Sequence, residues 1–94
     1  MTAYVIYNQL EVTDQNGWAE YRSHVRDALA EFGARVISSV AEPQILEGTW
    51  TGSHNVIIEF PDLETVDRWY KSDGYRPQRD LRLASARGNL PRII

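Results

Sequence analysis

Hydrophobic residues recur along the chain with two different spacings, and each change of spacing marks a change of element. Residues 3–12 alternate between two faces, with Tyr4 and Ile6 on one face and Val5 and Tyr7 on the other. A period of two is typical of a strand. We therefore expect the chain to open with a strand.

A helix is expected next, because the period lengthens from Asn16 onward and Thr13 and Asp14 can cap its start. Its apolar positions fall at helical spacing and form one stripe: Trp18, Tyr21, Val25, Ala28, Leu29 and Phe32. Gly33 suits the C′ position that ends a helix.

The middle of the chain predicts two further strands and a long connection. Residues 35–40 fit a strand, which Pro43 interrupts, and residues 44–47 resume an extended pattern as a bent continuation or a short edge strand. Residues 48–54 are rich in turn formers and predict a hairpin connection. Residues 55–60 contain consecutive β-branched residues and predict a central strand.

The last third predicts two helical segments and a final strand. Asp62 caps a helix whose apolar face combines Leu63, Val66, Trp69 and Tyr70. Residues 72–74 break the helical period, residues 75–87 resume it, and residues 90–94 suit an edge strand.

This order of elements, β-α-β-β-α-β, predicts an α+β, ferredoxin-like fold for residues 1–94 as a single domain. Its four-stranded antiparallel sheet carries helices on one face. The other face would expose Val5, Tyr7 and Ile57 to water, so we expect a homodimer through that open sheet face.

Composition narrows the classes of function. The chain has 43% hydrophobic and 24% charged residues, as ordinary globular proteins do, and it has no cysteine. With His24 and His54 as its two histidines, no metal site is expected, and the sequence motifs for nucleotide binding, zinc proteolysis and serine hydrolysis are absent. No cofactor is expected. The lack of a basic leader or a long apolar run predicts a cytoplasmic protein with no membrane partner.

Charge is distributed unevenly. Residues 1–67 hold three basic and eleven acidic side chains, whereas residues 68–94 hold seven basic and two acidic ones, and the total is −3. The arginines of the last third are spread along a helix, which favours a solvated face. A nucleic-acid partner is therefore not expected.

Several segments carry a resemblance that covers nearly the whole chain. They are AYVI, EVTD followed by WAEYR, LEGTW, IIEF followed by a proline, and RWYKSDGYRP leading to LR. In this order they resemble the uncharacterised domain-of-unknown-function family 1330 within the dimeric α+β barrel superfamily. The resemblance implies a dimeric α+β barrel and no established reaction. The chain is more distantly similar to barrels that act as cofactor-free monooxygenases, isomerases or haem-degrading enzymes.

One segment departs from that resemblance. Members of the family often carry an arginine and paired glycines after the second strand, where this chain has Ser38, Ser39 and Val40. A role for that glycine turn is not expected here.

His24 is a candidate catalytic residue, because it lies three residues after Tyr21 and four before Ala28, beside the apolar stripe of the first helix. There it could act as a general base or bind a ligand, since histidine changes charge near neutral pH. Alternatively, it is a half-buried histidine bonded to a backbone carbonyl or a carboxylate.

Aromatic side chains from separate segments could line an apolar pocket whose hydroxyls orient a small molecule. At helical spacing, they could equally form core. The residues are Tyr21, Trp50, Trp69, Tyr70 and Tyr75.

Two carboxylates, Glu47 and Glu59, lie in strand-like sequence. Glu59 is expected on the dimer face, paired with an arginine or a backbone donor across the interface. The alternative, a glycosidase-like acid pair, requires a separation that sequence does not fix.

Together these features predict a homodimer that binds a small apolar or aromatic molecule between helices and sheet. As an enzyme, it would perform cofactor-free isomerisation or oxygenation of a phenol-like substrate, with His24 as base, Tyr21 and Tyr75 orienting the substrate and Trp69 stacking on it. The alternative is a structural dimerisation module with a filled core and no ligand.

Overall fold

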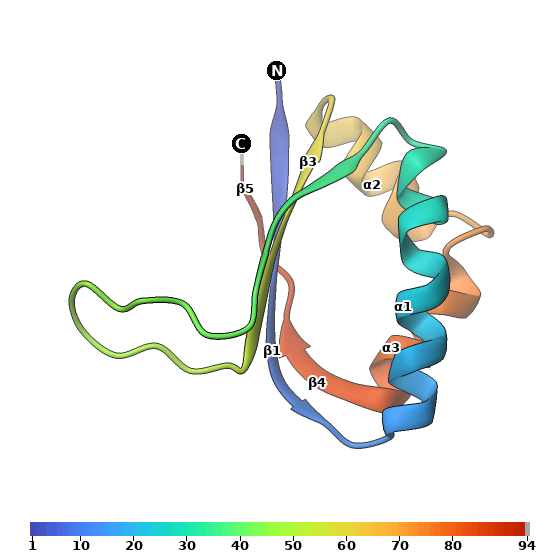
Figure 1. Ribbon diagram of the computed structural model, residues 1–94. Helices are drawn as coiled ribbons and strands as arrows, with labels where there is room; N and C mark the ends of the chain where they lie inside the picture. Colours follow the sequence, from blue (N-terminus) through green and yellow to red (C-terminus); the bar gives the residue numbers. More distant parts are fainter. Residues whose placement is uncertain (94) are drawn as a thin grey trace.

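The computed structural model describes residues 1–93 and places three helices on one face of an antiparallel sheet (Figure 1). The elements in chain order are β1 (Ala3–Val12), α1 (Gln15–Ala30), β2 (Arg35–Val40), β3 (His54–Phe60), α2 (Leu63–Lys71), α3 (Arg76–Ser85), β4 (Ala86–Asn89) and β5 (Arg92–Ile93).

The strands follow the order β2-β3-β1-β4 across the sheet, and each pair is antiparallel. The long strand β1 is central, and β5 pairs with it beyond β4. Consecutive elements thus form two interleaved β-α-β units, which is the split arrangement of a ferredoxin-like fold. The prediction of an α+β, ferredoxin-like domain is confirmed.

Local sequence accounts for where the helices begin. The Asp14 side chain accepts a hydrogen bond from the Gly17 amide at 3.2 Å, and Asp62 accepts bonds from the Thr65 amide and hydroxyl at 2.7 and 2.6 Å. Each carboxylate satisfies donors that a helix leaves free in its first turn. The bonds from Thr65 also hold the pKa of the Asp62 carboxyl below its usual value.

The two faces of β1 are assigned differently from the sequence-based expectation. Val5 and Tyr7 are buried beneath the helices, and the prediction that they lie on the open face is wrong. Ile6 pairs with Ile57 on the open face, where Ile57 was expected. Both faces of β1 carry apolar residues, so alternation alone does not show which face the helices cover.

The connection between β2 and β3 projects from the open side of the sheet, away from the helices (Figure 1). Residues 44–47 lie in this loop and form no strand, so the expected bent continuation or short edge strand is wrong. At its base, the loop is held by a bond from Asn8 Nδ2 to the Thr51 carbonyl at 2.8 Å and one from the Ser53 amide to the Gln9 carbonyl at 2.7 Å.

The end of the chain also differs from expectation. The second helical segment ends at Ser85, and β4 begins at once because Ala86 and Arg87 pair with β1. Sheet pairing here overrides a helical pattern that extended to residue 87. The expected final strand is present as the short β5, and residue 94 lies outside the described residues.

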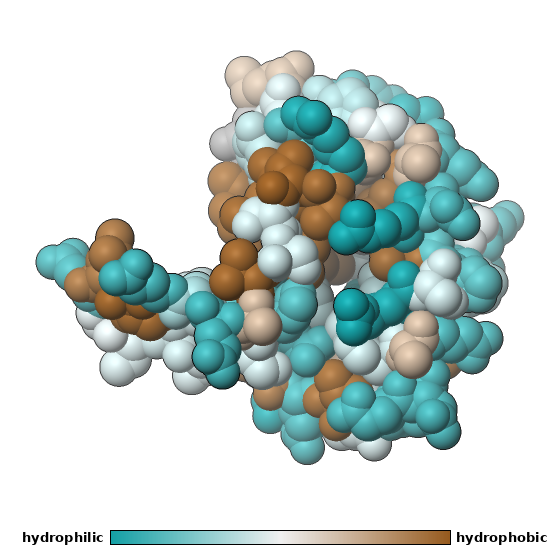
Figure 2. Space-filling view, viewed as in Figure 1, coloured by the Kyte–Doolittle hydropathy of each residue, from teal (hydrophilic) through white to brown (hydrophobic). Residues whose placement is uncertain are grey.

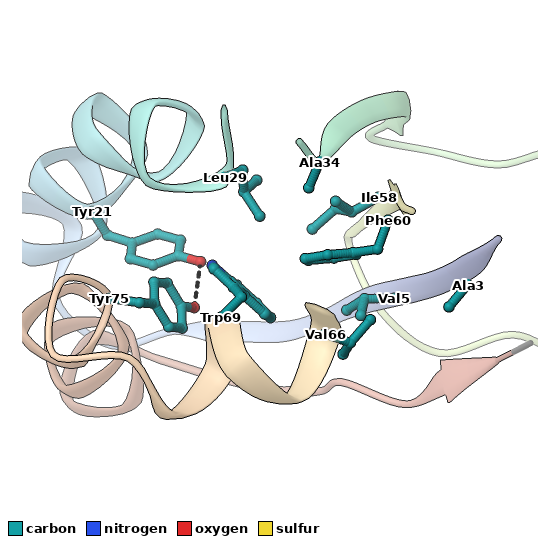
Figure 3. Close-up of a cluster of buried hydrophobic side chains, with 10 residues drawn as sticks. All are labelled: Ala3, Val5, Tyr21, Leu29, Ala34, Ile58, Phe60, Val66, Trp69 and Tyr75. Carbon is teal, nitrogen blue, oxygen red and sulfur yellow. Dashed lines mark hydrogen bonds between the residues drawn. The ribbon is translucent and has the colours of Figure 1, made fainter. Parts of the chain in front are cut away.

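The core lies between the helices and the sheet and is centred on Trp69, which is 1% exposed (Figure 3). Its ring centroid lies 5.2 Å from that of Phe60 and 4.3 Å from that of Tyr75. Val5, Leu29, Ile58 and other buried apolar side chains surround this aromatic group. Strand β3 and helix α2, together with the short turn between them, therefore supply much of the core.

Candidate functional site

A cavity of about 370 Å³ separates α1 from the sheet. Trp18, Tyr21 and Val25 line it from α1, and Val56 and Ile58 line it from β3. Figure 2 shows the hollow between the sheet and the helices, with hydrophilic residues at its edge. A concave, partly apolar space of this size is typical of a small-molecule site.

Stacked aromatic rings form one wall of the cavity. Trp18 lies between Tyr7 and Tyr21, with ring centroids 5.8 and 5.4 Å apart and interplanar angles of 29° and 20°. The helical period of α1 places Trp18 and Tyr21 on the side facing the sheet, and the alternation of β1 places Tyr7 opposite them. Trp18 was recognised in the sequence as part of the apolar stripe and not as a site residue.

The predicted pair Tyr21 and Tyr75 meets in the core, with the two hydroxyl oxygens 3.0 Å apart (Figure 3). Burial, reinforced by the neighbouring Tyr75, raises the pKa of the Tyr21 phenol far above its usual range. Tyr21 is consequently a neutral hydrogen-bonding group and not a base. It lines the cavity, whereas Tyr75 supports it from behind.

Trp69 borders the main cavity and also a second one of about 270 Å³ beneath α2. Tyr70 lines the second cavity only, so the expected aromatic cluster divides between two spaces. The Trp69 Nε1 group is buried and has no hydrogen-bond partner among residues 1–93. This donor is an unsatisfied polar group on a side chain that lines both cavities.

Trp50 does not join this cluster, and its predicted place in the pocket is wrong. It lies in the projecting loop with 55% of its surface exposed, and its Nε1 donates to Asn55 Oδ1 at 2.9 Å. Asn55 pairs with Asn8 on the open face of the sheet. Sequence placed Trp50 in a turn but carried no signal for the side of the sheet on which that turn lies.

His24 is exposed on α1 and lines neither cavity, so its expected position beneath the sheet is wrong. The buried side of α1 follows Gly17, Tyr21, the half-buried Val25 and Leu29, at intervals of four residues. His24, three positions after Tyr21, falls beside this line and is exposed.

His54, which sequence reasoning did not select, is the histidine that lines the cavity. Its Nε2 lies 2.7 Å from the hydroxyl of Ser39, another lining residue on β2. His54 alternates with Val56 and Ile58 along β3, so the period of that strand could have identified it. The sequence pattern did not reveal it because residue 54 falls in the segment predicted as the hairpin connection.

Arg82 is a second group that sequence reasoning missed. It is 4% exposed, and its guanidinium carbon lies 5.4 Å from the centroid of the Tyr7 ring. Burial raises the pKa of the Tyr7 phenol despite the opposing effect of the Arg82 charge. In the sequence, Arg82 was one of several arginines assigned to a solvated helix face.

The two carboxylates do not form an acid pair. Glu47 is exposed in the projecting loop. Glu59 Oε1 accepts from Arg35 Nε at 3.1 Å, so its arginine partner belongs to the same chain and not to a second subunit. Within residues 1–93, no three histidine, cysteine, aspartate or glutamate side chains cluster closely enough to hold a metal ion.

Among residues 1–93, no helix has the length and apolar character needed to cross a bilayer.

The fold and the cavity together define a ferredoxin-like α+β domain with a pocket between its helices and its sheet. The chain belongs to the domain-of-unknown-function family DUF1330, whose model matches residues 2–93. A comparison with curated protein sequences found no match.

Solved structures share the fold at low sequence identity. A protein of unknown function from Rhodopseudomonas palustris is 15% identical, with a TM-score of 0.77 over 98% of this chain and 80% of its own. A dimeric ferredoxin-like protein of unknown function from Jannaschia sp. is 10% identical, with a TM-score of 0.76 over 100% and 99%. SnoaB, a cofactor-independent oxygenase from Streptomyces nogalater, is 9% identical, with a TM-score of 0.72 over 99% and 91%.

Proposed function

We propose that this protein is a cytosolic homodimer in which each subunit binds a small aromatic molecule in the cavity beneath α1. The observation that carries the proposal is the cavity of about 370 Å³ with a wall of stacked rings. A structural module with a filled core would have no such space beside Trp69. The cavity therefore favours the binding function over that alternative.

The lining suggests how a flat ligand is held. Its ring packs against the apolar side chains of Val25, Val56 and Ile58, with the Trp18 ring as a stacking surface. Trp69 Nε1, which lacks a partner among residues 1–93, donates to a polar group on the ligand. Of the two joined hydroxyls of Tyr21 and Tyr75, the one that accepts still has a proton to donate.

The reaction that we propose to test is cofactor-free oxygenation or isomerisation of a bound phenol-like substrate. Support comes from the fold shared with SnoaB and from the place of His54 at the cavity. In this scheme His54 accepts the phenolic proton and Ser39 orients its ring, while Tyr21 stays protonated and donates. His24 has no part in it because its side chain faces solvent.

The dimer that we propose forms through the open sheet face. That face carries Ile6 and Ile57 at its centre and the exposed Val40 and Ile93 at its sides. A single subunit has 6130 Å² of accessible surface, whereas a compact monomer of 10.8 kDa has about 5,500 Å². Two of the solved structures that share the fold are described as dimeric.

Light scattering coupled to size-exclusion chromatography tests this assembly. We expect twice the subunit mass at micromolar concentration, and we expect Ile57→Asp to release monomers by placing a charge at the interface. His24→Asp is the matched control, because it adds the same side chain at an exposed position on the opposite layer. A wild-type protein that elutes as a stable monomer would refute the dimer.

A thermal-shift screen against phenols, aromatic acids and quinones tests ligand binding. A ligand at a hundred times its Kd stabilises the native state by about 2.7 kcal/mol, which corresponds to a shift of roughly 10–20 °C for a domain of this size. Val25→Trp fills the cavity and should abolish the shift, whereas Leu83→Trp adds the same side chain at an exposed site that lines neither cavity. A shift that survives Val25→Trp would place the ligand elsewhere.

A further inference from the structure

The charges around the cavity have one sign, although the chain as a whole is acidic. The net charge is −3, yet the lining contains two arginines, one histidine and no aspartate or glutamate. The arginines are Arg22 and Arg26, which lie one turn apart on α1. A site with this lining attracts anions in preference to neutral or cationic molecules.

Arg22 and Arg26 have no compensating partner nearby. Neither forms an ion pair within 4.0 Å among residues 1–93, although α1 also carries acidic residues. Like charges spaced four residues apart on a helix repel each other by a few tenths of a kcal/mol. A negative group on a ligand in the cavity would relieve this repulsion.

A third arginine, Arg82 on α3, lies against Tyr7, which lines the cavity from β1. Arg82 is 96% buried, since 4% of its surface is exposed, and no carboxylate among residues 1–93 lies within 4.0 Å of it. Its Nε also lacks a hydrogen-bond partner there. Arginine keeps its charge when buried, and no carboxylate among the described residues compensates this cation.

Tyr7 connects Arg82 to the cavity. The Tyr7 ring lies against the guanidinium and lines the cavity, and its buried hydroxyl has no hydrogen-bond partner among residues 1–93. Gly88 permits this arrangement, because a Cβ at that position would lie 2.9 Å from Tyr7 Cε1 and 3.0 Å from its hydroxyl oxygen. The proton of the Tyr7 hydroxyl thus has no acceptor among residues 1–93, and the hydroxyl lies next to a buried positive charge.

We propose that the cavity selects aromatic ligands that carry a negative group, a carboxylate or a phenolate, bound at the Tyr7 hydroxyl with Arg82 behind it. Arg22 and Arg26 raise the positive potential on the facing wall. This inference rests on the proposed binding function and adds the charge of the ligand to it. The alternative is that the arginines are solvated or structural and the cavity prefers uncharged rings.

A pair of probes with one shape and different charge distinguishes these readings. We would measure the Kd of 2-naphthoate and 2-naphthamide by isothermal titration calorimetry at pH 7, in low salt and in 0.3 M salt. We expect the carboxylate to bind at least tenfold more tightly than the amide. We also expect this preference to shrink at high salt, because salt screens exposed charges.

Single-residue variants show which side chains produce the preference for the carboxylate over the amide. Tyr7→Phe should reduce the carboxylate-to-amide ratio about fivefold or more while the amide Kd changes less than threefold, and Arg82→Met should do the same if it folds. Arg22→Gln and Arg26→Gln lie at exposed positions and should each weaken carboxylate binding two- to fivefold. Arg76→Gln, which removes an arginine that lines neither cavity, is the matched control and should change neither Kd.

The outcomes separate this inference from the proposed function. If the amide binds as tightly as the carboxylate, the charge preference is refuted while the cavity remains a binding site. A preference that persists unchanged in Tyr7→Phe and in both α1 arginine variants also refutes it. If neither probe binds in a saturable manner and the wider thermal-shift screen is flat, both proposals are refuted.

Discussion

The hydrogen bond between Tyr21 and Tyr75 joins α1 to the segment before α3 across 54 residues of sequence. Both side chains are largely buried, with 8% and 1% of their surfaces exposed. Removing either hydroxyl as Tyr21→Phe or Tyr75→Phe keeps the ring and its packing. The perturbation therefore removes one hydroxyl at a time at the wall of the cavity.

The size of the effect follows from that burial. A hydrogen bond of this kind contributes about 1 kcal/mol net, and the hydroxyl left without its partner adds a desolvation cost. We expect each single variant to lower the free energy of unfolding by about 1 kcal/mol, which lowers the Tm by about 4–8 °C for a domain of this size. The double variant should lose much less than the sum, with a coupling free energy of about 0.5–1 kcal/mol.

This double-mutant cycle is measured by urea denaturation of the wild type, the two single variants and the double variant, all at one protein concentration. Tyr70→Phe is the control, because Tyr70 is half-buried and its hydroxyl has no hydrogen-bond partner among residues 1–93, so a loss below about 0.5 kcal/mol is expected. If the losses from Tyr21→Phe and Tyr75→Phe simply add, the two hydroxyls do not stabilise each other and the described geometry of the cavity wall is refuted.

Further predictions concern stability and pH. Gly88→Ala should lower the free energy of unfolding by about 1–3 kcal/mol in urea denaturation, because its Cβ would lie 2.6 Å from the Asn8 carbonyl oxygen. Gly74→Ala, whose nearest contact would be at 3.9 Å, should be nearly neutral. Equal effects of the two substitutions would contradict this packing. Asp62→Asn should reduce stability at pH 7, and the difference should vanish as the pH falls through the depressed folded-state pKa, because protonated wild type then loses the same charge at the helix start. A pH-independent difference in thermal melts would contradict that linkage.

The fold was predictable because the period of the hydrophobic residues changes clearly at Asp14 and again at Asp62, where caps begin α1 and α2. The face assignment of β1 was not, because Val5 and Ile6 are equally apolar and their alternation is symmetrical. Nor was the path of residues 41–53 predictable, since an extended pattern next to Pro43 requires a neighbouring strand before it can pair. The local hydrophobic pattern predicts which helices and strands form, whereas long-range contacts determine which parts of the protein pack against each of them.

The candidate site was predictable only in part. The aromatic residues that meet around Trp69 were identifiable by type, and helical spacing brought Tyr21 to the buried side of α1. Arg82 was not identifiable, because a buried arginine and a solvated one look alike in a helix with polar residues on most sides. The choice between His24 and His54 depended on one boundary, the residue at which β3 begins.

Strand β3 contributes adjacent residues to both the proposed dimer interface and the proposed ligand site. Ile57 faces the open side, where we place the dimer contact, whereas Ile58 faces the cavity, where we place the ligand. Neither surface has to open for the other to be occupied, so we expect a monomeric Ile57→Asp variant to keep its pocket. Because dimerisation itself stabilises the native state at high protein concentration, a ligand shift is interpretable only when wild type and variant are compared at one concentration. A ligand shift that disappears in the monomeric variant would mean that the second subunit completes the pocket.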